Sequence, residues 1–311
     1  MLKLGASDLV VSELCLGAMF LGTRTDRTAS LQVLDGYVEA GGNFVDSANI
    51  YAHWVPGFKG GESETLIGEW LRSRGRRSDI VIATKVGFDY PGVERGLPAR
   101  RILEECDKSL KRLGVDTIDL YYAHVDDYTT PLEETLEAFN RLVAAGKVRY
   151  IGASNYLAWR LERARCTSLT NHWAPFCCVQ QRHTYLRIKP GGVTAPQVAS
   201  NPDLIDYSRR TGLPILAYSI LLGGAYTNPA RAIGPEYSGP DTDARLAMLR
   251  TVAAECGATV PQIIIAWMRQ SDYPVLPLIA ASRTDQLHEL VGALAVNLSD
   301  DQMQRLDSAG G

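Results

Sequence analysis

The sequence predicts an α/β protein that folds as a (β/α)8 TIM barrel, with a short N-terminal β-hairpin and a C-terminal helical extension. Two observations favour this fold class. Short apolar runs with the length and composition of buried strands alternate with amphipathic stretches at helical spacing along nearly the whole chain. Eight such runs within roughly 280 residues fit a closed parallel barrel better than an open sheet.

The expected strands are separated by helical stretches, and each is followed by a polar or glycine-containing segment. In chain order they are Leu14–Leu16, Asn43–Val45, Ile80–Ala83, Ile118–Tyr122, Val148–Ile151, Phe176–Val179, Pro214–Ala217 and Val275–Leu278. The carboxyl ends of barrel strands form the catalytic face, so we expect the polar segments to line it. Residues Leu2–Val10 have the pattern of a small hairpin that caps the other end.

Two amphipathic stretches show the expected helices most clearly. The apolar face of the first consists of Leu103, Cys106, Leu110 and Leu113, and its charged face of Glu104, Glu105, Lys108, Lys111 and Arg112. The second begins after Pro131, and Gly146 ends it in the position where glycine usually terminates a helix.

Composition and charge limit the classes of function. Lys plus Arg total 32 against 35 Asp plus Glu, a formal net charge of -3. This balance gives no electrostatic basis for binding nucleic acid or an anionic membrane. No stretch approaches about 18 consecutive apolar residues, so no membrane span is expected. Lys3, Asp8 and Glu13 do not suit the apolar core of a signal peptide, and we expect a cytoplasmic protein.

The six cysteines lie in apolar segments, with no C-x-x-C motif and no Cys/His group at zinc spacing. We therefore expect reduced, buried thiols and no metal site. Cys177 and Cys178 are adjacent, and in a regular strand their side chains would point to opposite faces.

We expect one domain over residues 1–311. A prior of about 150 residues per domain suggests two, but α/β barrels of this length are often single domains. No linker rich in Pro, Gly or Ser divides the chain. The irregular stretches Ile188–Pro202 and Ala225–Thr242 are long enough to be functional loops of that domain. The oligomeric state stays open.

Four ionisable residues lie at or just after successive expected strands: Asp46, Tyr51, Lys85 and His124. Taken singly, each has an ordinary explanation as a cap, turn, rim or core residue. In a barrel they would meet at one mouth, where a buried Lys85 needs a partner and Asp46 is the obvious one. The ammonium would lower the pKa of Tyr51, and His124 would orient a carbonyl oxygen. Together these groups suit reduction of an aldehyde or ketone once a hydride is supplied.

Longer motifs follow in order along nearly the whole chain: Val11–Gly17, Gly42–Tyr51, Gly61–Glu64, Leu66–Gly68, Ile82–Lys85, Ser109–Asp116, Ile118–Tyr121 with His124, and Gly146–Asn155. In these motifs the chain resembles the aldo-keto reductase family. The resemblance implies a (β/α)8 barrel that binds NADP(H), with NAD less favoured, and reduces a small-molecule carbonyl reversibly with Tyr51 as proton donor. In agreement, no G-x-G-x-x-G follows an expected strand.

The resemblance also implies the residues that contact the nicotinamide. Ser154, Asn155 and Gln180 would hold its carboxamide. Tyr218, followed by Ser219, would stack on its ring. Apart from the resemblance, ordinary turn and cap roles would explain these residues.

The same resemblance assigns the rest of the cofactor. Leu221 and Gly223 would run along the pyrophosphate, where small residues allow close approach. Ser282 and Arg283 would meet a 2′-phosphate, and Gln286 would lie at the adenine end. This favours NADPH over NADH.

The sequence departs from the family pattern near both ends of the cofactor. Ala280 stands where the family usually has Gly, and Leu290 where an Asn often reaches the adenine. The segment after Gln180 also differs, and within it we expect His183 to be structural in preference to contacting substrate.

Three aromatic residues are candidate substrate contacts: Phe20, Trp54 and Trp173. Aromatic walls suit flat or sugar-like ligands, although loop packing explains such residues equally well. Two alternative functions stay open. One is a Schiff-base aldolase or lyase with Lys85 as the nucleophile, which needs no nicotinamide site. The other is a non-enzymatic, cofactor-binding regulatory subunit, a role that similar barrels have in channel complexes.

Overall fold

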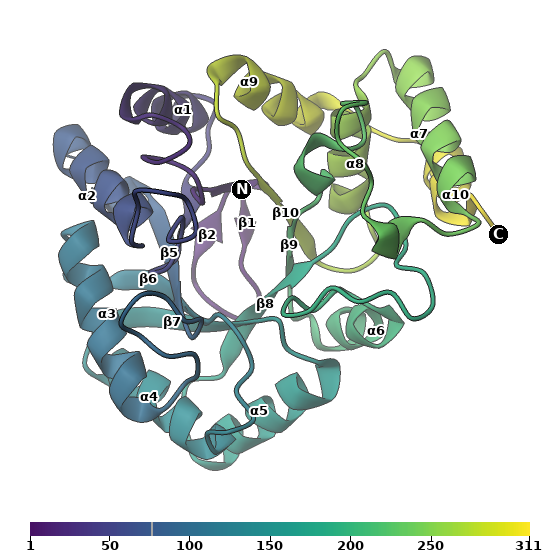
Figure 1. Ribbon diagram of the computed structural model, residues 1–311. Coiled ribbons are helices and arrows are strands. Elements are labelled where there is room, and N and C mark those ends of the chain that lie inside the picture. Colours follow the sequence, from purple (N-terminus) through teal and green to yellow (C-terminus); the bar gives the residue numbers. More distant parts are fainter. Residues whose placement is uncertain (76) are drawn as a thin grey trace.

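Eight parallel strands close into a barrel in the computed structural model, which describes residues 1–75 and 77–311 (Figure 1). The barrel strands are β3 (Cys15–Gly17), β4 (Phe44–Asp46), β5 (Val81–Val86), β6 (Ile118–Ala123), β7 (Val148–Ser154), β8 (Phe176–Arg182), β9 (Ile215–Tyr218) and β10 (Val275–Ile279). Each pairs with the next along the chain, and β10 also pairs with β3. This last pairing closes the barrel and confirms the predicted fold class.

Several strands extend further at their carboxyl ends than the apolar runs indicated. β5 includes Lys85, β7 continues to Ser154 and β8 continues to Arg182. Their backbones remain in the sheet, since Ser154 pairs with Gln180 and Arg182 with Tyr218. A polar side chain at the open end of a barrel does not interrupt the strand that carries it, which is why the apolar pattern ended too early.

Helices surround the barrel on all sides (Figure 1). They are α1 (Arg27–Glu39), α2 (Glu62–Arg74), α3 (Ala99–Leu113), α4 (Leu132–Ala144), α5 (Ala158–Thr170), α6 (Pro202–Thr211), α7 (Thr242–Cys256), α8 (Val260–Arg269), α9 (Thr284–Gly292) and α10 (Asp300–Ser308). Short 3-10 turns add η1 (Arg77–Asp79), η2 (Leu222–Gly224), η3 (Pro235–Tyr237) and η4 (Ala293–Ala295). The two helices predicted in detail correspond to α3 and α4, and α10 forms the C-terminal extension.

One residue of α3 lies elsewhere than its spacing indicated. Glu105 was expected on the charged outer face, yet it is only 1% exposed. It is buried because its carboxylate accepts hydrogen bonds from Asn49 and Tyr90, which lie beside the mouth of the barrel.

The N-terminal hairpin closes the end of the barrel opposite the polar strand ends, as predicted. Its strands β1 (Leu2–Lys3) and β2 (Val10–Val11) pair antiparallel and are seen through the middle of the barrel in Figure 1. Leu4, Leu9 and Val11 belong to the same buried cluster as barrel residues such as Phe44 and Leu216. This apolar closure leaves the carboxyl-terminal end as the open one.

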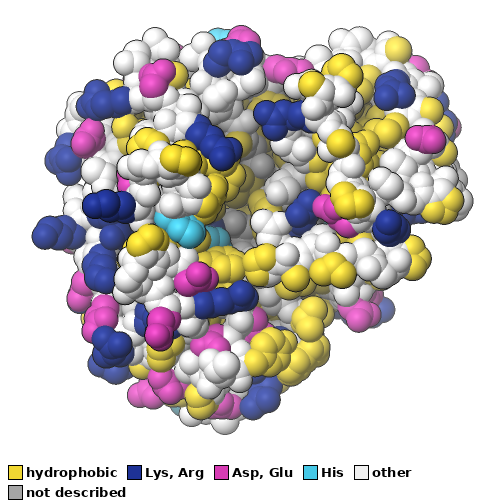
Figure 2. All heavy atoms as spheres, in the orientation of Figure 1, with side chains coloured by type: hydrophobic (Ala, Val, Ile, Leu, Met, Phe, Trp, Pro, Cys, Tyr) yellow, Lys and Arg dark blue, Asp and Glu magenta, His cyan; other side chains and the backbone are white. Residues whose placement is uncertain are grey.

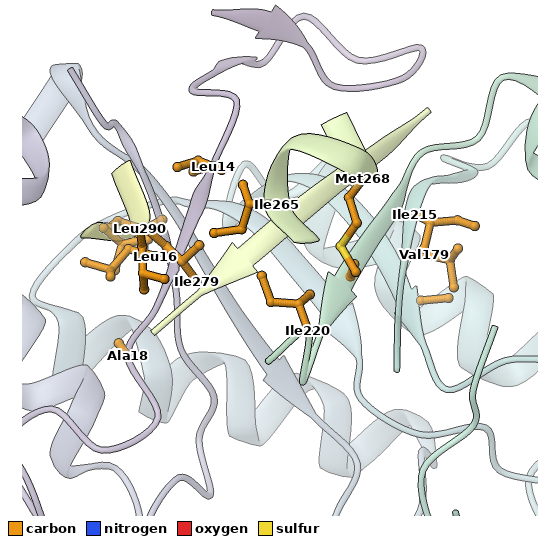
Figure 3. Packing of buried hydrophobic residues seen from close by; sticks show 14 of the residues in the cluster. Leu14, Leu16, Ala18, Val179, Ile215, Ile220, Ile265, Met268, Ile279 and Leu290 are labelled. Atoms are coloured by element: carbon orange, nitrogen blue, oxygen red, sulfur yellow. The ribbon is translucent and has the colours of Figure 1, made fainter. Parts of the chain in front are cut away.

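A second hydrophobic cluster fills the space between the barrel and the outer helices. Figure 3 shows Leu16 of β3, Ile279 of β10 and Leu290 of α9 packed together at the seam where the barrel closes. Burying each such side chain contributes about 1.5–3 kcal/mol. The strand ends that carry the polar residues are therefore held from both faces.

The register between β7 and β8 shifts at the two adjacent cysteines. Between two paired positions β7 has one residue, Gly152, whereas β8 has two, Cys177 and Cys178. This is a β-bulge, which breaks the alternation of side chains. Both cysteines belong to the buried cluster that contains Phe44 and Leu216, and their sulfur atoms are 4.0 Å apart. The expectation that they face opposite sides is wrong for this reason. All six cysteines are free thiols, and Cys166 is exposed rather than buried.

Among the described residues, no single helix combines the length and the apolar composition of a membrane span. Helices α7 and α8, which meet at an angle of 93°, meet both criteria as a bent pair. Within residues 1–75 and 77–311, no group of three or more His, Cys, Asp or Glu side chains could hold a metal ion.

Gly68 allows α2 to approach the end of α3, and a side chain there should destabilise the fold. A Cβ at Gly68 would lie 2.5 Å from the carbonyl oxygen of Arg112 and 2.6 Å from that of Leu113. We expect Gly68→Ala to lower the free energy of unfolding in urea by about 1–3 kcal/mol, since backbone atoms must move. Gly36→Ala in α1 is the control, because its Cβ would meet only a side-chain methyl of Leu287 at 3.3 Å. Equal effects of the two changes would contradict this explanation.

Candidate active site

Asp46, Tyr51, Lys85 and His124 come together at the open end of the barrel. Asp46 is the last residue of β4, Lys85 lies in β5 and His124 directly follows β6. These strands are neighbours, and the segment after β4 folds back so that Tyr51 reaches Lys85. Figure 2 shows this face of the molecule hollowed at its centre. We call these four residues the mouth cluster.

The side chain of Lys85 is fully buried and makes three hydrogen bonds. Its Nζ donates to Asp46 Oδ1, to the carbonyl oxygen of Ser47 at 2.5 Å and to the hydroxyl oxygen of Tyr51 at 2.7 Å. The side chains of Lys85 and Asp46 are both 0% exposed. The ion pair expected between them is therefore present, and the three acceptors together define one position for Nζ.

Asp46 uses both carboxylate oxygens. Oδ2 accepts a hydrogen bond of 2.9 Å from Gln180 Nε2, while Oδ1 faces Lys85 and lies 3.5 Å from the Tyr51 hydroxyl. Burial raises the pKa of Asp46 and lowers that of Lys85, so each charge depends on the other. The bond from Gln180 was not predicted, because it joins strands on different sides of the barrel.

The surroundings of Tyr51 raise the pKa of its phenol. Desolvation in the mouth is the main cause and the nearby Asp46 carboxylate adds to it, so the pKa lies well above the usual 10.0. The lowered pKa expected for Tyr51 is therefore wrong, because desolvation outweighs the effect of the neighbouring ammonium. Tyr51 stays protonated at neutral pH. Its oxygen accepts from Lys85, and its own hydrogen has only the distant Asp46 Oδ1 as an acceptor in the mouth cluster.

His124 is buried, yet its ring is without a hydrogen-bond partner among the described residues. Nδ1 is a buried atom that makes no hydrogen bond. Burial and then the charge of Lys85 lower the pKa of His124 well below 6.5, so the imidazole is neutral at neutral pH. Buried polar groups without partners are uncommon. This ring is therefore a candidate contact for a ligand.

Phe88 completes the surroundings of His124 and was not among the predicted site residues. Its ring packs edge-on against His124 with centroids 4.7 Å apart, and the Tyr51 ring lies 6.0 Å from the same imidazole. Phe88 follows the end of β5 by two residues. An aromatic residue in that position, directly after a strand that carries a candidate lysine, was the signal available in the sequence.

The side chain of Asn155 connects the mouth cluster to the next strand ends. Asn155 follows Ser154, the last residue of β7. Its Oδ1 accepts from the Tyr218 hydroxyl at 2.7 Å and from the Val198 N–H at 3.0 Å, and its Nδ2 donates to the His124 carbonyl oxygen at 2.9 Å. Ser154, Asn155 and Tyr218 thus lie together as the sequence predicted. Val198 belongs to the irregular stretch expected to be a functional loop.

The turn after β9 contains several residues with left-handed backbone conformations. Ser219, Leu222 and Gly223 have φ angles of +57°, +49° and +64°, and Leu221 lies between the first two. The N–H groups of Leu222, Gly224 and Ala225 donate to the carbonyl oxygens of Ser219, Leu221 and Leu222 within the turn. Arg231 Nη1 lies 3.5 Å from where a Cβ of Gly223 would be. Arg231 was not singled out from the sequence, because it follows the turn by eight residues.

The residues assigned to the adenosine end are bonded to one another. Arg283 Nε and Nη2 donate to the two carboxylate oxygens of Asp285, both at 2.9 Å. Ser282 donates through its N–H at 3.0 Å and its hydroxyl at 2.9 Å to Gln286 Oε1. All four residues lie at the start of α9. Asp285, an acidic neighbour of the expected phosphate contact, was not considered in the sequence prediction.

Phe20 and Trp54 form an aromatic wall at the open end of the barrel. Their ring centroids are 6.4 Å apart and their ring planes are nearly perpendicular. Trp54 is 44% exposed. Trp173 lies elsewhere. It precedes β8 and follows α5, so it sits at the amino-terminal end of the barrel, where segments leading into strands are found. Its prediction as a substrate contact is wrong for this reason.

His183 lies in a structural environment, as expected. It is buried, its Nε2 is 3.0 Å from the Tyr273 hydroxyl, and its ring stacks on Trp267 with centroids 5.9 Å apart. Burial lowers its pKa to about 4. A neutral, packed imidazole of this kind contributes to the core.

Comparisons with known proteins agree with this geometry. The model of the Aldo/keto reductase family matches residues 13–310. The chain is similar to the aldo-keto reductase str7 of Strobilurus tenacellus (33% identity, 97% of this chain and 89% of the relative). It is also similar to the aryl-alcohol dehydrogenase [NADP(+)] of Phanerodontia chrysosporium (29% identity, 96% and 82%). Among solved structures, a thermostable aldo-keto reductase in complex with the inhibitor epalrestat has a TM-score of 0.78 and 27% identity, with both chains fully covered.

The buried ion pair should reveal itself in stability measurements. We expect Asp46→Asn or Lys85→Met alone to lower the free energy of unfolding by about 3–5 kcal/mol, because each leaves a buried charge without its partner. The double variant should lose clearly less than the sum of the two. Urea unfolding at neutral pH measures all three, and the exposed pair Arg100 and Glu104 of α3 provides a control with little coupling. Strictly additive losses at Asp46 and Lys85 would contradict the interpretation.

Proposed function

Because the chain belongs to the aldo/keto reductase family, we propose that it reduces an aldehyde or ketone to an alcohol with NADPH, and catalyses the reverse oxidation. The observation that carries this proposal is the 2.7 Å hydrogen bond from Lys85 Nζ to the Tyr51 hydroxyl oxygen. A phenol held against a buried ammonium can release its proton because the phenolate is stabilised as it forms. We further propose that residues 1–311 act as one domain.

In the proposed mechanism, Tyr51 gives its hydroxyl proton to the carbonyl oxygen as negative charge develops there. Lys85 keeps its hydrogen bond to the Tyr51 oxygen and stabilises the phenolate that remains. Asp46 and the Ser47 carbonyl hold Nζ in position during this step. The neutral ring of His124 donates a hydrogen bond to the same carbonyl oxygen and orients it. In the oxidation direction the Tyr51 phenolate takes the proton back.

The strand ends from β7 to β9 fit a nicotinamide. NADPH supplies, when bound, the hydride that reduces the carbonyl carbon. We propose that Ser154, Asn155 and Gln180 hold the carboxamide and that Tyr218, followed by Ser219, stacks on the ring. In support, Gln180 Oε1 makes no hydrogen bond to a described residue, while its Nε2 is fixed by Asp46. Asn155 would share or exchange the bonds it makes within the protein.

The phosphates fit the segments after β9 and β10. We propose that Leu221 and Gly223 run along the pyrophosphate, with Arg231, which lies beside Gly223, as the neighbouring cation. We propose that Ser282 and Arg283 meet the 2′-phosphate of NADPH and that Gln286 lies at the adenine. Arg283 has the planar, two-donor edge that suits a phosphate, and it currently directs that edge at Asp285.

A flat aromatic carbonyl is the substrate class that we favour over a sugar-like one. Phe20 and Trp54 form one wall, and Phe88 packs on His124. Planar rings suit such walls because stacking and edge contacts add to the burial of apolar area. The name of one relative, an aryl-alcohol dehydrogenase [NADP(+)], supports the same class and the same cofactor.

The two alternative functions have less support. A Schiff-base nucleophile needs an unprotonated amine that can reach the substrate. Lys85 Nζ instead directs three hydrogen bonds at Asp46, Ser47 and Tyr51 and has no exposed surface. A purely regulatory barrel needs no proton donor, and the complete mouth cluster has no explanation under that reading.

Removal of one oxygen tests the proposed chemistry. Tyr51→Phe should lower kcat by at least about 100-fold, since the proton donor is lost, while the Kd for NADPH stays nearly unchanged. NADPH consumption with a panel of aromatic and sugar aldehydes measures the first, and protein fluorescence the second. Tyr128→Phe is the control, because it removes an exposed phenol from the segment after β6. A Tyr51→Phe enzyme with normal kcat would refute the role. A wild-type protein that binds NADPH but oxidises it with no carbonyl would favour the regulatory alternative.

Asp285 should weaken the preference for NADPH. Its carboxylate occupies the edge of Arg283 that a 2′-phosphate would use. We expect Asp285→Asn to tighten NADPH binding about two- to fivefold, the range of an exposed ion pair, and to leave NADH unchanged. Glu289→Gln in the same helix controls for net charge. Fluorescence titration of both cofactors gives the answer, and an equal gain for NADH would contradict the proposed phosphate contact.

A further inference from the structure

We propose that Glu105 is a positioning residue that holds the two halves of the proton-transfer site together. It lies on α3, outside the barrel, and contacts no residue of the mouth cluster directly. Through one carboxylate oxygen it binds both the segment that carries Tyr51 and the loop that packs on His124. The inference deepens the proposed function and rests on it only for the effect on turnover.

The contacts of Glu105 are those of a buried junction. Oε2 accepts a hydrogen bond of 2.7 Å from Asn49 Nδ2 and one of 2.8 Å from the Tyr90 hydroxyl. Oε1 accepts from Lys108 Nζ at 2.7 Å. These bonds lower the pKa of Glu105 despite its burial, so the carboxylate is charged. Hydrogen bonds to a charged acceptor are shorter and stronger than those between neutral groups.

Asn49 connects Glu105 to the proton donor. It lies between Asp46 and Tyr51, and its backbone N–H donates to the carbonyl oxygen of Lys85 at 3.3 Å. Its side chain is buried, and Oδ1 makes no hydrogen bond to a described residue, so Glu105 is what fixes the amide. The path of the chain from Asp46 to Tyr51 is thus tied from outside the barrel.

Tyr90 connects the same oxygen to the other half of the site. It lies two residues after Phe88, whose ring packs on His124 with centroids 4.7 Å apart. Tyr90 also forms a two-way backbone bridge with Val93, so its loop is a defined turn. Loss of Glu105 would free Tyr51 and His124 to move relative to each other, and both have to meet one carbonyl oxygen.

The variant Glu105→Gln keeps the size of the side chain and removes its charge. We expect kcat to fall roughly 10- to 100-fold, because misplacement of reacting groups by about 1 Å has effects of this order. The Kd for NADPH should change little, since the proposed cofactor residues lie on other strands. Tyr90→Phe, which cuts only the tie to His124, should give part of the loss and add little in the Glu105→Gln background. Glu104→Gln is the matched control on the same helix, with its partner Arg100 in an exposed pair.

A second readout does not depend on turnover. The chain has five histidines, so the ring signals of His124 can be assigned in an NMR spectrum by comparison with His124→Asn. We expect these signals to shift or broaden in Glu105→Gln and Tyr90→Phe, and to stay in place in Glu104→Gln. Unmoved His124 signals together with an unchanged kcat would overturn the inference. A fall in kcat explained entirely by unfolding at the assay temperature would overturn it as well. If no carbonyl is reduced by the wild type, the proposed function fails, and the NMR result still decides the positioning role.

Discussion

The buried ammonium of Lys85 is the interaction on which the mouth of the barrel depends. A desolvated ammonium is costly unless each of its N–H groups has an acceptor. Lys85 Nζ therefore needs three acceptors within reach, which are Asp46, the Ser47 carbonyl and the Tyr51 hydroxyl. That requirement fixes the register of β4 against β5 and the turn that follows β4. It also puts the proposed proton donor against a cation that can stabilise its conjugate base. Stability and chemistry therefore demand the same geometry of the same residues.

The layer behind β5 supports this arrangement. Glu64 is fully buried and accepts a hydrogen bond of 2.6 Å from Thr84, the neighbour of Lys85, and one of 2.5 Å from Arg112. The negative charge of Glu64 also favours the protonated form of Lys85. Arg112 reaches Glu64 because Gly68 lets α2 and α3 approach closely. A polar network between barrel and helices thus adds to the hydrophobic packing that holds the strands of the mouth cluster.

Order along the chain made most of the fold predictable, and most of the failures came from contacts between distant parts of the chain. The apolar runs predicted all of the barrel strands, because a parallel strand that is buried on both faces consists mostly of apolar residues. Contacts that depend on distant parts of the chain were not visible. The helical spacing placed Glu105 on the surface, whereas its hydrogen bonds to Asn49 and Tyr90 bury it. The pKa of Tyr51 depends on burial, which cannot be inferred from the spacing of residues in the sequence. Trp173 precedes β8, and a position before a strand indicates the amino-terminal end of the barrel. The sequence offered that signal, whereas the bulge at Cys177 and Cys178 left none.

The proposed cofactor contacts and the proposed substrate contact differ in the hydrogen bonds that their side chains already make within the protein. Asn155 is bonded to Tyr218 and Val198, and Arg283 to Asp285. A cofactor that binds there exchanges hydrogen bonds instead of adding them, so each contact brings little net free energy. Such exchange suits a group that must leave after every turnover. The His124 ring has no partner to give up among the described residues. A carbonyl oxygen bonded to this ring, as proposed, would therefore displace no hydrogen bond within the protein, in contrast to the proposed cofactor contacts at Asn155 and Arg283.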